Sequence, residues 1–258
     1  MCPQTTSAGL TARELVDYLD RVLEAGRFRD YCPNGLQVAG TRPVRRLVAG
    51  VSASKALIEA ALAVDADALL VHHGYFWKGE DPCLVGIRRE RIALLLEHGL
   101  SLIAYHLPLD AHPEWGNNIG LGRKLGWQVD GAFGGDPPLA LCGHLAAPTP
   151  PSQVEAALAA ALGRAPLWIP GGDHPVARIG WCTGAAQDYI EEAATLGLDA
   201  FVSGEVSEQT VHVAREAGIH YFAAGHHATE RFGVQALAAH LGEYFGIASE
   251  YIEVDNPV

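Results

Sequence analysis

Histidines are the residues of this sequence whose types and spacing favour metal chemistry. The stretch LLVHHGYFW places His72 and His73 side by side at the end of an apolar run and follows them with Gly74. Successive side chains of a strand point to opposite faces, so the two imidazoles share one site only if the chain turns there, which a glycine allows. Two partly buried histidines with ordinary hydrogen-bond partners explain the pair equally well.

Two further histidines each precede a carboxylate by four residues. His106 is followed by Asp110, and His226 is followed by Glu230. In a helical turn this spacing stacks the ring and the carboxylate on one face, the geometry by which i and i+4 ligands bind one cation. Imidazole nitrogens and carboxylate oxygens together suit Zn, Fe, Mn or Co better than Ca or Cu(I). Because so many donors exceed what one catalytic ion takes, they predict two divalent transition-metal ions per subunit.

The charge balance and the cysteine content disfavour several classes of protein. The 258 residues include 18 Lys and Arg against 30 Asp and Glu, a net charge of -12, so nucleic-acid binding is not expected. The five cysteines are odd in number and form no CxxC pair, which argues against a disulfide framework and a thiolate zinc site. No leader-like segment or long apolar run is present, so we expect a cytoplasmic protein with no membrane segment.

Segments with strand and helix patterns alternate along the chain and position these histidines. Thr11 and Glu14 predict a capping box for a first helix that ends near Gly26. The elements expected after it are, in order, strand RLVAGVS, helix SKALIEAALAVD, strand ALLVHH, helix GIRRERIALLLEHG, strand LSLIAYHL and helix NIGLGRKLG. Such alternation predicts an α/β fold with a largely parallel or mixed sheet flanked by helices.

The same order of elements returns in the second half of the chain. At an offset of 132 residues, RLVAGVSASKALIEAALAVDADALLVHHG aligns with RIGWCTGAAQDYIEEAATLGLDAFVSGEV, and His73 falls opposite Glu205. A one-residue slip further on aligns the two histidine and carboxylate pairs. The repeat predicts two similar α/β lobes from an internal duplication, with the metal site in the cleft between them. Two unrelated βαβ units of similar apolar periodicity are the alternative.

The lobe boundary is expected in the middle of the chain. The segment GAFGGDPPLALCGHLAAPTPPS is rich in Gly and Pro, which is typical of a connection. We therefore expect a first lobe over residues 1–129 and a second over residues 130–258. The sequence leaves open which lobe takes the final segment, YFGIASEYIEVDNPV, because it can pack back on the first lobe.

Five strings spread over residues 31–233 carry a specific resemblance: YCPNGLQVAG, VHHGYFWKGE, YHLPLDAHPEWGNN, SGEVSEQT and GHHATERFG. With them the chain resembles the NIF-three-like dinuclear metal-centre family, the GTP cyclohydrolase 1 type 2 homologues, and is similar to the bacterial short form. The resemblance implies a two-lobed α/β protein with two divalent ions in its cleft and a toroidal hexamer built as a trimer of dimers. It makes five residues the metal ligands: His72, His73, Asp110, His226 and Glu230. His106 matches as well, as a sixth ligand or a proton-transfer group.

Two functions remain open at this point. The first is a metal-dependent hydrolase of a small heterocycle or nucleotide such as GTP, with His106, Glu205 or His227 transferring protons. The alternative is a non-enzymatic metal-handling or adaptor protein.

Several other features have both a functional and a structural interpretation. Glu205 is either a carboxylate at a helix N-terminus or the partner of a metal-bound histidine or water. The turn CTGAAQ is a weak candidate for binding a phosphate. Tyr75, Phe76 and Trp77 either stack on a substrate ring or pack in the core.

Overall fold

The computed structural model describes residues 10–258 and divides the chain into two compact units. Unit 1 consists of the described residues up to Leu109 and of Gly233–Asp255, and unit 2 consists of Asp110–Phe232 and Asn256–Val258. These units differ from the lobes expected over residues 1–129 and 130–258. Residues 110–129 belong to unit 2, and residues 233–255 belong to unit 1. No helix in the described part of the chain is long and apolar enough to cross a membrane.

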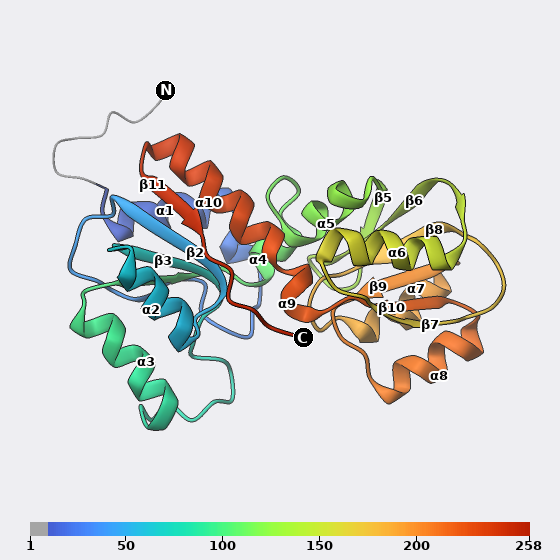
Figure 1. The fold of residues 1–258 in the computed structure, drawn as a ribbon, viewed down its shortest axis with the longest axis horizontal. Helices are drawn as coiled ribbons and strands as arrows, with labels where there is room; N and C mark the ends of the chain where they lie inside the picture. The colour runs from blue at the N-terminus through green and yellow to red at the C-terminus, as the bar shows by residue number, and fades with distance from the viewer. Residues whose placement is uncertain (1–9) are drawn as a thin grey trace. The chain divides into compact units, whose positions relative to one another are not determined.

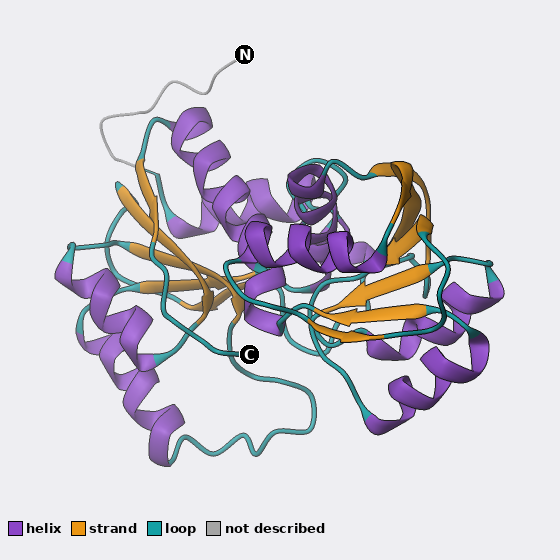
Figure 2. Cartoon of the chain, turned by 45° about the vertical axis from the view of Figure 1, so that its right-hand side comes forward, coloured by secondary structure: helices purple, strands orange, loops and turns teal. Residues whose placement is uncertain are grey.

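Unit 1 is built on a five-stranded sheet with helices on both faces (Figures 1 and 2). The strand order is β1-β4-β3-β2-β11, in which β4, β3, β2 and β11 are parallel and β1 is antiparallel to β4. The strands are β1 (Gly35–Val38), β2 (Arg46–Ser52), β3 (Ala68–His73), β4 (Ser101–Ala104) and β11 (Ala248–Tyr251). The pairing of β11 with β2 gives the final segment, which the sequence left open, a place in this sheet.

Two pairs of helices cover the sheet of unit 1. They are α1 (Ala12–Val22), α2 (Lys55–Ala63), α3 (Gly86–Glu97) and the part of α10 (Arg231–Phe245) from Gly233 onward, with a 3-10 turn at Ala25–Arg27. Figure 1 shows α2 and α3 below the sheet and α1 and α10 above it. Apolar side chains of α2 and α3, such as Leu57 and Leu95, enter one core cluster, while Tyr18 of α1 stacks on Tyr244 of α10. The predicted capping box on Thr11 is confirmed.

Unit 2 is built on a six-stranded mixed sheet in the order β5-β6-β8-β9-β10-β7. The strands β8, β9 and β10 are parallel, and the other pairs are antiparallel. The strands are β5 (Gln128–Phe133), β6 (Ala140–Thr149), β7 (Leu167–Ile169), β8 (Val176–Trp181), β9 (Ala200–Ser203) and β10 (His220–Ala223). The mixed α/β class expected from the alternation of elements is confirmed in both units.

The helices of unit 2 also lie on both faces of their sheet. They are α5 (Asn117–Leu125), α6 (Pro151–Leu162), α7 (Ile190–Thr195), α8 (Glu208–Ala217) and α9 (His226–Thr229), with a 3-10 turn at Gln187–Tyr189. Residues of α5 and α6 pack around Trp181 in one core cluster, and residues of α7 and α8 pack around Phe201 in another. The short helix α4 (Leu107–Ala111) runs from the end of unit 1 into the start of unit 2.

The Gly- and Pro-rich middle of the chain is not a connection between the units. It forms half of β5 and all of β6, which pair antiparallel inside the sheet of unit 2. Gly134 and Gly135 lie in the turn between them with φ of +73° and +101°, a region that other residues rarely adopt. The glycines and prolines that indicated a linker therefore lie in a hairpin turn, in the two strands and at the start of α6.

The internal repeat is visible in the pairing register. Leu47 lies opposite Ala68 in the β2/β3 pair, and Ile179 lies opposite Ala200 in the β8/β9 pair, so both partners are displaced by 132 residues. The aspartate before the second strand of each pair also has the same role. Its Oδ2 accepts two successive backbone N–H groups, from Arg45 and Arg46 to Asp67 and from Ala177 and Arg178 to Asp199.

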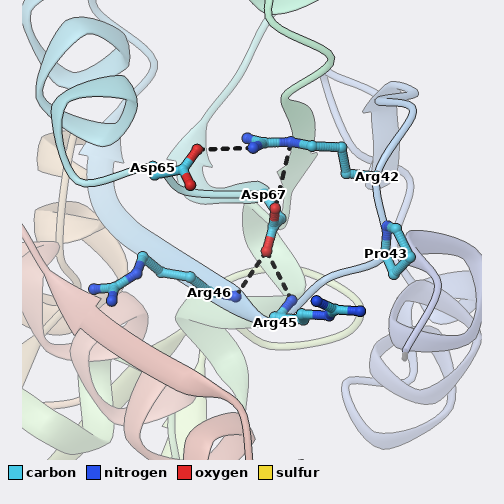
Figure 3. A pocket seen from close by; sticks show the side chains of 6 residues that line it. All are labelled: Arg42, Pro43, Arg45, Arg46, Asp65 and Asp67. Carbon is cyan, nitrogen blue, oxygen red and sulfur yellow. Dashed lines mark hydrogen bonds and ion pairs between the residues drawn. The ribbon is translucent and has the colours of Figure 1, made fainter. Parts of the chain in front are cut away.

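Figure 3 shows this arrangement around Asp67, where the guanidinium of Arg42 also pairs with Asp65. Replacing Asp67 by Ala is expected to lower the free energy of unfolding by about 2 to 3 kcal/mol, because two backbone N–H groups lose a charged acceptor. Urea unfolding followed by circular dichroism measures the change. The control is Asp65→Asn, because the Asp65 side chain is 88% exposed and Asn tolerates the φ of +54° at this position, so the midpoint should change little. An unchanged midpoint for Asp67→Ala would contradict the proposed role of this carboxylate.

Candidate metal-binding clusters

Unit 1 brings three of the predicted histidines together. His72 and His73 end β3, and His106 follows β4 by two residues. The ring centroids of His72 and His73 lie 4.6 Å apart, and those of His72 and His106 lie 5.0 Å apart. Each of the three rings offers a nitrogen within 4.8 Å of the others, a group that could hold a metal ion. We call these three residues the unit 1 cluster.

The chain turns directly after His73, as Gly74 predicted. A Cβ on Gly74 would lie 2.1 Å from Oε1 of Gln37, and this oxygen accepts the N–H of Tyr75 at 2.7 Å. The hydroxyl of Tyr75 donates to the carbonyl of Ala53 in the core, so this aromatic residue has the structural role. Trp77 instead lies beside the cluster, with its ring 5.0 Å from that of His106.

An oxygen partner holds Nδ1 of each histidine in the unit 1 cluster. Nδ1 of His72 lies 2.9 Å from the carbonyl oxygen of Tyr105, and Nδ1 of His73 lies 3.0 Å from Oγ of Ser52. Nδ1 of His106 lies 2.7 Å from Oδ1 of Asp30. Because a carbonyl or carboxylate only accepts, the rings of His72 and His106 donate through Nδ1, and in the neutral ring the lone pair is then on Nε2. Metal-binding histidines show this arrangement almost always.

Unit 2 gathers three more predicted ligands, Asp110, His226 and Glu230, which we call the unit 2 cluster. As the four-residue spacing predicts, the ring and the carboxylate lie together: Nε2 of His226 is 3.1 Å from Oε2 of Glu230. An oxygen of Asp110 also lies within 4.8 Å of an oxygen of Glu230, although both residues are buried. Two buried carboxylates at this separation repel each other unless a cation or a proton offsets their charge. The donor chemistry of this cluster therefore fits a divalent ion.

Hydrogen bonds inside unit 2 fix the position of Asp110. Its Oδ1 accepts from Nδ2 of Asn117 at 2.9 Å and from the hydroxyl of Thr183 at 3.3 Å. Asn117 begins α5 and Thr183 follows β8, so two elements hold one carboxylate. Such support is typical of a ligand that must keep its orientation.

The turn CTGAAQ serves the carboxylate of Glu230 and does not resemble a phosphate site. A Cβ on Gly184 would lie 2.1 Å from Oε1 of Glu230, so the glycine leaves the space that this carboxylate occupies. The N–H groups of Thr183 and Gly184 donate to side chains of unit 2, those of Asn118 and Thr229. These two backbone donors are therefore already used and are not available to a phosphate.

Glu205 lies behind His226. Its Oε1 is 2.7 Å from Nδ1 of His226, while the following helix α8 is capped by Ser207 and Thr210. The contact supports the interpretation of Glu205 as a partner of the histidine over that of a carboxylate at the helix N-terminus. His227, the third candidate for proton transfer, is buried, and its backbone N–H donates to the carbonyl of Val258.

Charges around the clusters change two pKa values. Burial works to lower the pKa of His226, but the hydrogen bonds and charges of Glu230 and Glu205 outweigh it and raise that pKa to about 9. Burial works to raise the pKa of Asp30, but the hydrogen bond and charge of His106, with bonds from Asn34 and Tyr31, bring it below its ordinary value. In the metal-free protein His226 is therefore protonated and Asp30 ionised at neutral pH.

Sequence reasoning found the histidines and carboxylates of both clusters but missed the residues that orient them. These are Asp30, Ser52, Asn117, Thr183 and Gly184. A signal existed for Ser52 and Thr183, because each stands at the carboxyl end of a parallel strand, where functional residues of α/β proteins gather. Asp30 and Asn117 stand in or beside loops without such a marker.

Comparisons with known proteins agree over nearly the whole chain. A family model described as Duf34/NIF3 (NGG1p interacting factor 3) matches residues 10–257. A Pseudomonas aeruginosa protein named GTP cyclohydrolase 1 type 2 homolog is 55% identical over 245 residues, 94% of this chain and 97% of that protein. A protein of the same name from Allochromatium vinosum is 56% identical over 251 residues, 95% and 96% of the two chains. The solved structure of a protein called ybgI, of unknown function, matches with a TM-score of 0.93 at 46% identity and covers 96% of this chain and 100% of its own.

The raised pKa of His226 gives a test in the metal-free protein. Histidine NMR resonances followed against pH should show this ring losing its proton near pH 9. Replacing Glu205 by Gln removes one stabilising charge and should lower the midpoint by about 1 pH unit. The control is Glu208→Gln, since Glu208 is 92% exposed and pairs with His212 instead. A midpoint of His226 near 6.5, unmoved by Glu205→Gln, would refute this electrostatic account.

Proposed function

We propose, starting from the fact that this chain belongs to the Duf34/NIF3 family, that it holds two divalent transition-metal ions and hydrolyses a small heterocyclic substrate. The observation that carries the proposal is the pair of buried carboxylates in the unit 2 cluster, Asp110 and Glu230, beside the imidazole of His226. The three imidazoles of the unit 1 cluster supply a second set of donors. The name of the relatives, GTP cyclohydrolase 1 type 2 homolog, indicates a purine nucleotide such as GTP as the substrate class.

The proposed ligands are those expected from the sequence: His72, His73, Asp110, His226 and Glu230. Nitrogen and oxygen donors in this proportion suit Zn, Fe, Mn or Co. Two such ions, when bound, supply Lewis-acid activation of water and of the substrate.

The chain's own residues would then orient the donors and move protons. His106, whose Nδ1 donates to Asp30, has Nε2 as its proton-accepting or metal-binding atom. Glu205 holds the ring of His226 through Nδ1 and is 39% exposed, so it can also exchange a proton with solvent. We propose Nε2 of His106 as a sixth metal donor, in the unit 1 cluster, and Glu205, beside His226, as the group that accepts the proton from the attacking water.

Hydrolysis is tested with protein loaded separately with Mn and Zn and incubated with GTP and other purine nucleotides. Elemental analysis of protein purified without chelator should first give two transition-metal ions per chain. We then expect loss of the purine absorbance and release of formate, and Asp110→Asn should lower the rate by at least about 100-fold. Asp130→Asn, at an exposed aspartate of unit 2 paired with His144, is the matched control and should leave the rate unchanged.

The outcomes separate two functions. Two firmly bound ions with no turnover from either metal form would refute the hydrolase and favour a metal-handling or adaptor protein. Protein without any transition metal, even after loading, would refute both.

We also propose that the chain assembles as a homo-oligomer, with the toroidal hexamer as the expected state. Support comes from the start of α3, where Val85 and Ile87 expose 65% and 68% of their surface. Neighbouring apolar side chains this exposed are typical of surfaces that a partner covers. Sedimentation equilibrium should give six times the chain mass at micromolar concentration, and a single-chain mass throughout a dilution series would contradict the proposal.

A further inference from the structure

A buried carboxylate outside the proposed ligand set lies behind His106. The side chain of Asp30 is only 3% exposed, yet four donors reach it. Its Oδ1 accepts from Nδ1 of His106 at 2.7 Å and from the N–H of Tyr31 at 2.6 Å. Its Oδ2 accepts from Nδ2 of Asn34 and from the N–H of Leu107, each at 2.9 Å. A buried carboxylate is stable when its lone pairs are engaged in this way.

The loop that carries Asp30 holds His106 at both the ring and the backbone. Oδ1 of Asn34 accepts the N–H of His106 at 2.8 Å, while Asp30 binds the ring and the next backbone N–H. The ring can therefore neither flip nor change tautomer without breaking the bond to the carboxylate. Because Nδ1 donates, Nε2 is the nitrogen that carries the lone pair in the neutral ring and that a metal can bind.

Asp30 is better explained as a partner of His106 than as a metal ligand itself. Donor atoms of Asp30, Cys32 and His106 lie within 4.8 Å of one another, which is close enough for a metal site. However, the oxygens of Asp30 already accept four hydrogen bonds. Burial, with the nearby charge of Asp30, raises the pKa of Cys32 to about 12, and a protonated thiol is a poor ligand.

The second unit shows the same contact made by a different route. Glu205 holds Nδ1 of His226 at 2.7 Å, as Asp30 holds Nδ1 of His106. Glu205 follows β9 inside the repeated segment, whereas Asp30 precedes β1 and lies outside it. The duplication therefore does not account for the contact of Asp30. In each unit the corresponding histidine has a carboxylate at Nδ1, although the two carboxylates come from unrelated segments. We infer that the histidine itself needs such a partner.

We propose that Asp30 is a positioning residue, which fixes His106 with Nε2 as its donor atom and so strengthens divalent-metal binding by the unit 1 cluster. The inference rests on the metal binding of the proposed function and not on hydrolysis. A carboxylate at Nδ1 also makes the ring a stronger donor, and loss of such a partner typically weakens metal binding by about 10- to 100-fold.

The test is a titration of the metal-free full chain with Co²⁺, followed by its visible absorption. Asp30→Asn keeps the shape of the side chain but replaces two acceptor positions by donors, and should weaken Co²⁺ binding by about 10- to 100-fold with a changed spectrum. The matched control is Asp130→Asn, because Asp130 and His144 make the same contact at 2.9 Å on an exposed surface. In a His106→Ala background, Asp30→Asn should add no further loss.

Each outcome decides a different claim. A wild-type chain that binds Co²⁺ and an Asp30→Asn variant with the same affinity and spectrum would overturn the role of Asp30 and leave the proposed function standing. A wild-type chain that binds no Co²⁺ would overturn both. If Asp30→Asn does not fold, long-range ¹H–¹⁵N NMR of the metal-free wild type decides, since His106 should carry its proton on Nδ1. A proton on Nε2 instead would overturn the proposal.

Discussion

Both clusters depend on imidazole rings whose Nδ1 is already held by an oxygen of the same unit. In unit 1 the parallel register supplies two of these oxygens, because Ser52 of β2 lies opposite His73 of β3 and the carbonyl of Tyr105 follows β4. A ring held at Nδ1 has one remaining nitrogen and one orientation. The sheet therefore determines both where the histidines lie and which atom each can offer.

In unit 2 a cluster residue and two of the partner residues also lie at the carboxyl ends of the parallel strands, but the residue types differ. Thr183 follows β8, Glu205 follows β9 and His226 follows β10, all at the carboxyl ends of parallel strands. The repeat preserves the strand register and the aspartates that bind two backbone N–H groups, whereas the side chains at this edge differ. At the carboxyl ends of its parallel strands unit 1 therefore carries three imidazoles, whereas unit 2 carries one hydroxyl, one carboxylate and one imidazole.

Local patterns in the sequence predicted what local physics determines. The strands β2 and β3 match the expected segments residue for residue, and the spacing of His226 and Glu230 gave a contact that the fold realises. The sequence did not predict features that depend on contacts between residues distant in the chain. Gly and Pro between residues 131 and 152 look alike in a linker and in a hairpin, and only the pairing of β5 with β6 decides between them. Asp30 acts on a histidine 76 residues away, a separation with no periodicity to reveal it.

The carboxylates of unit 2 explain why one histidine differs from the rest. Asp110 and Glu230 bring two buried carboxyl groups close together, and Glu205 adds a third carboxyl group beside His226. In the metal-free chain the hydrogen bonds and charges of Glu230 and Glu205 favour the proton on His226, which is why its pKa rises despite burial. A divalent ion supplies more positive charge than that proton and would displace it, so the same electrostatic arrangement that stabilises the imidazolium favours a metal in its place. The cost of burying these acidic groups is then offset in both states, by a proton in one and by a cation in the other.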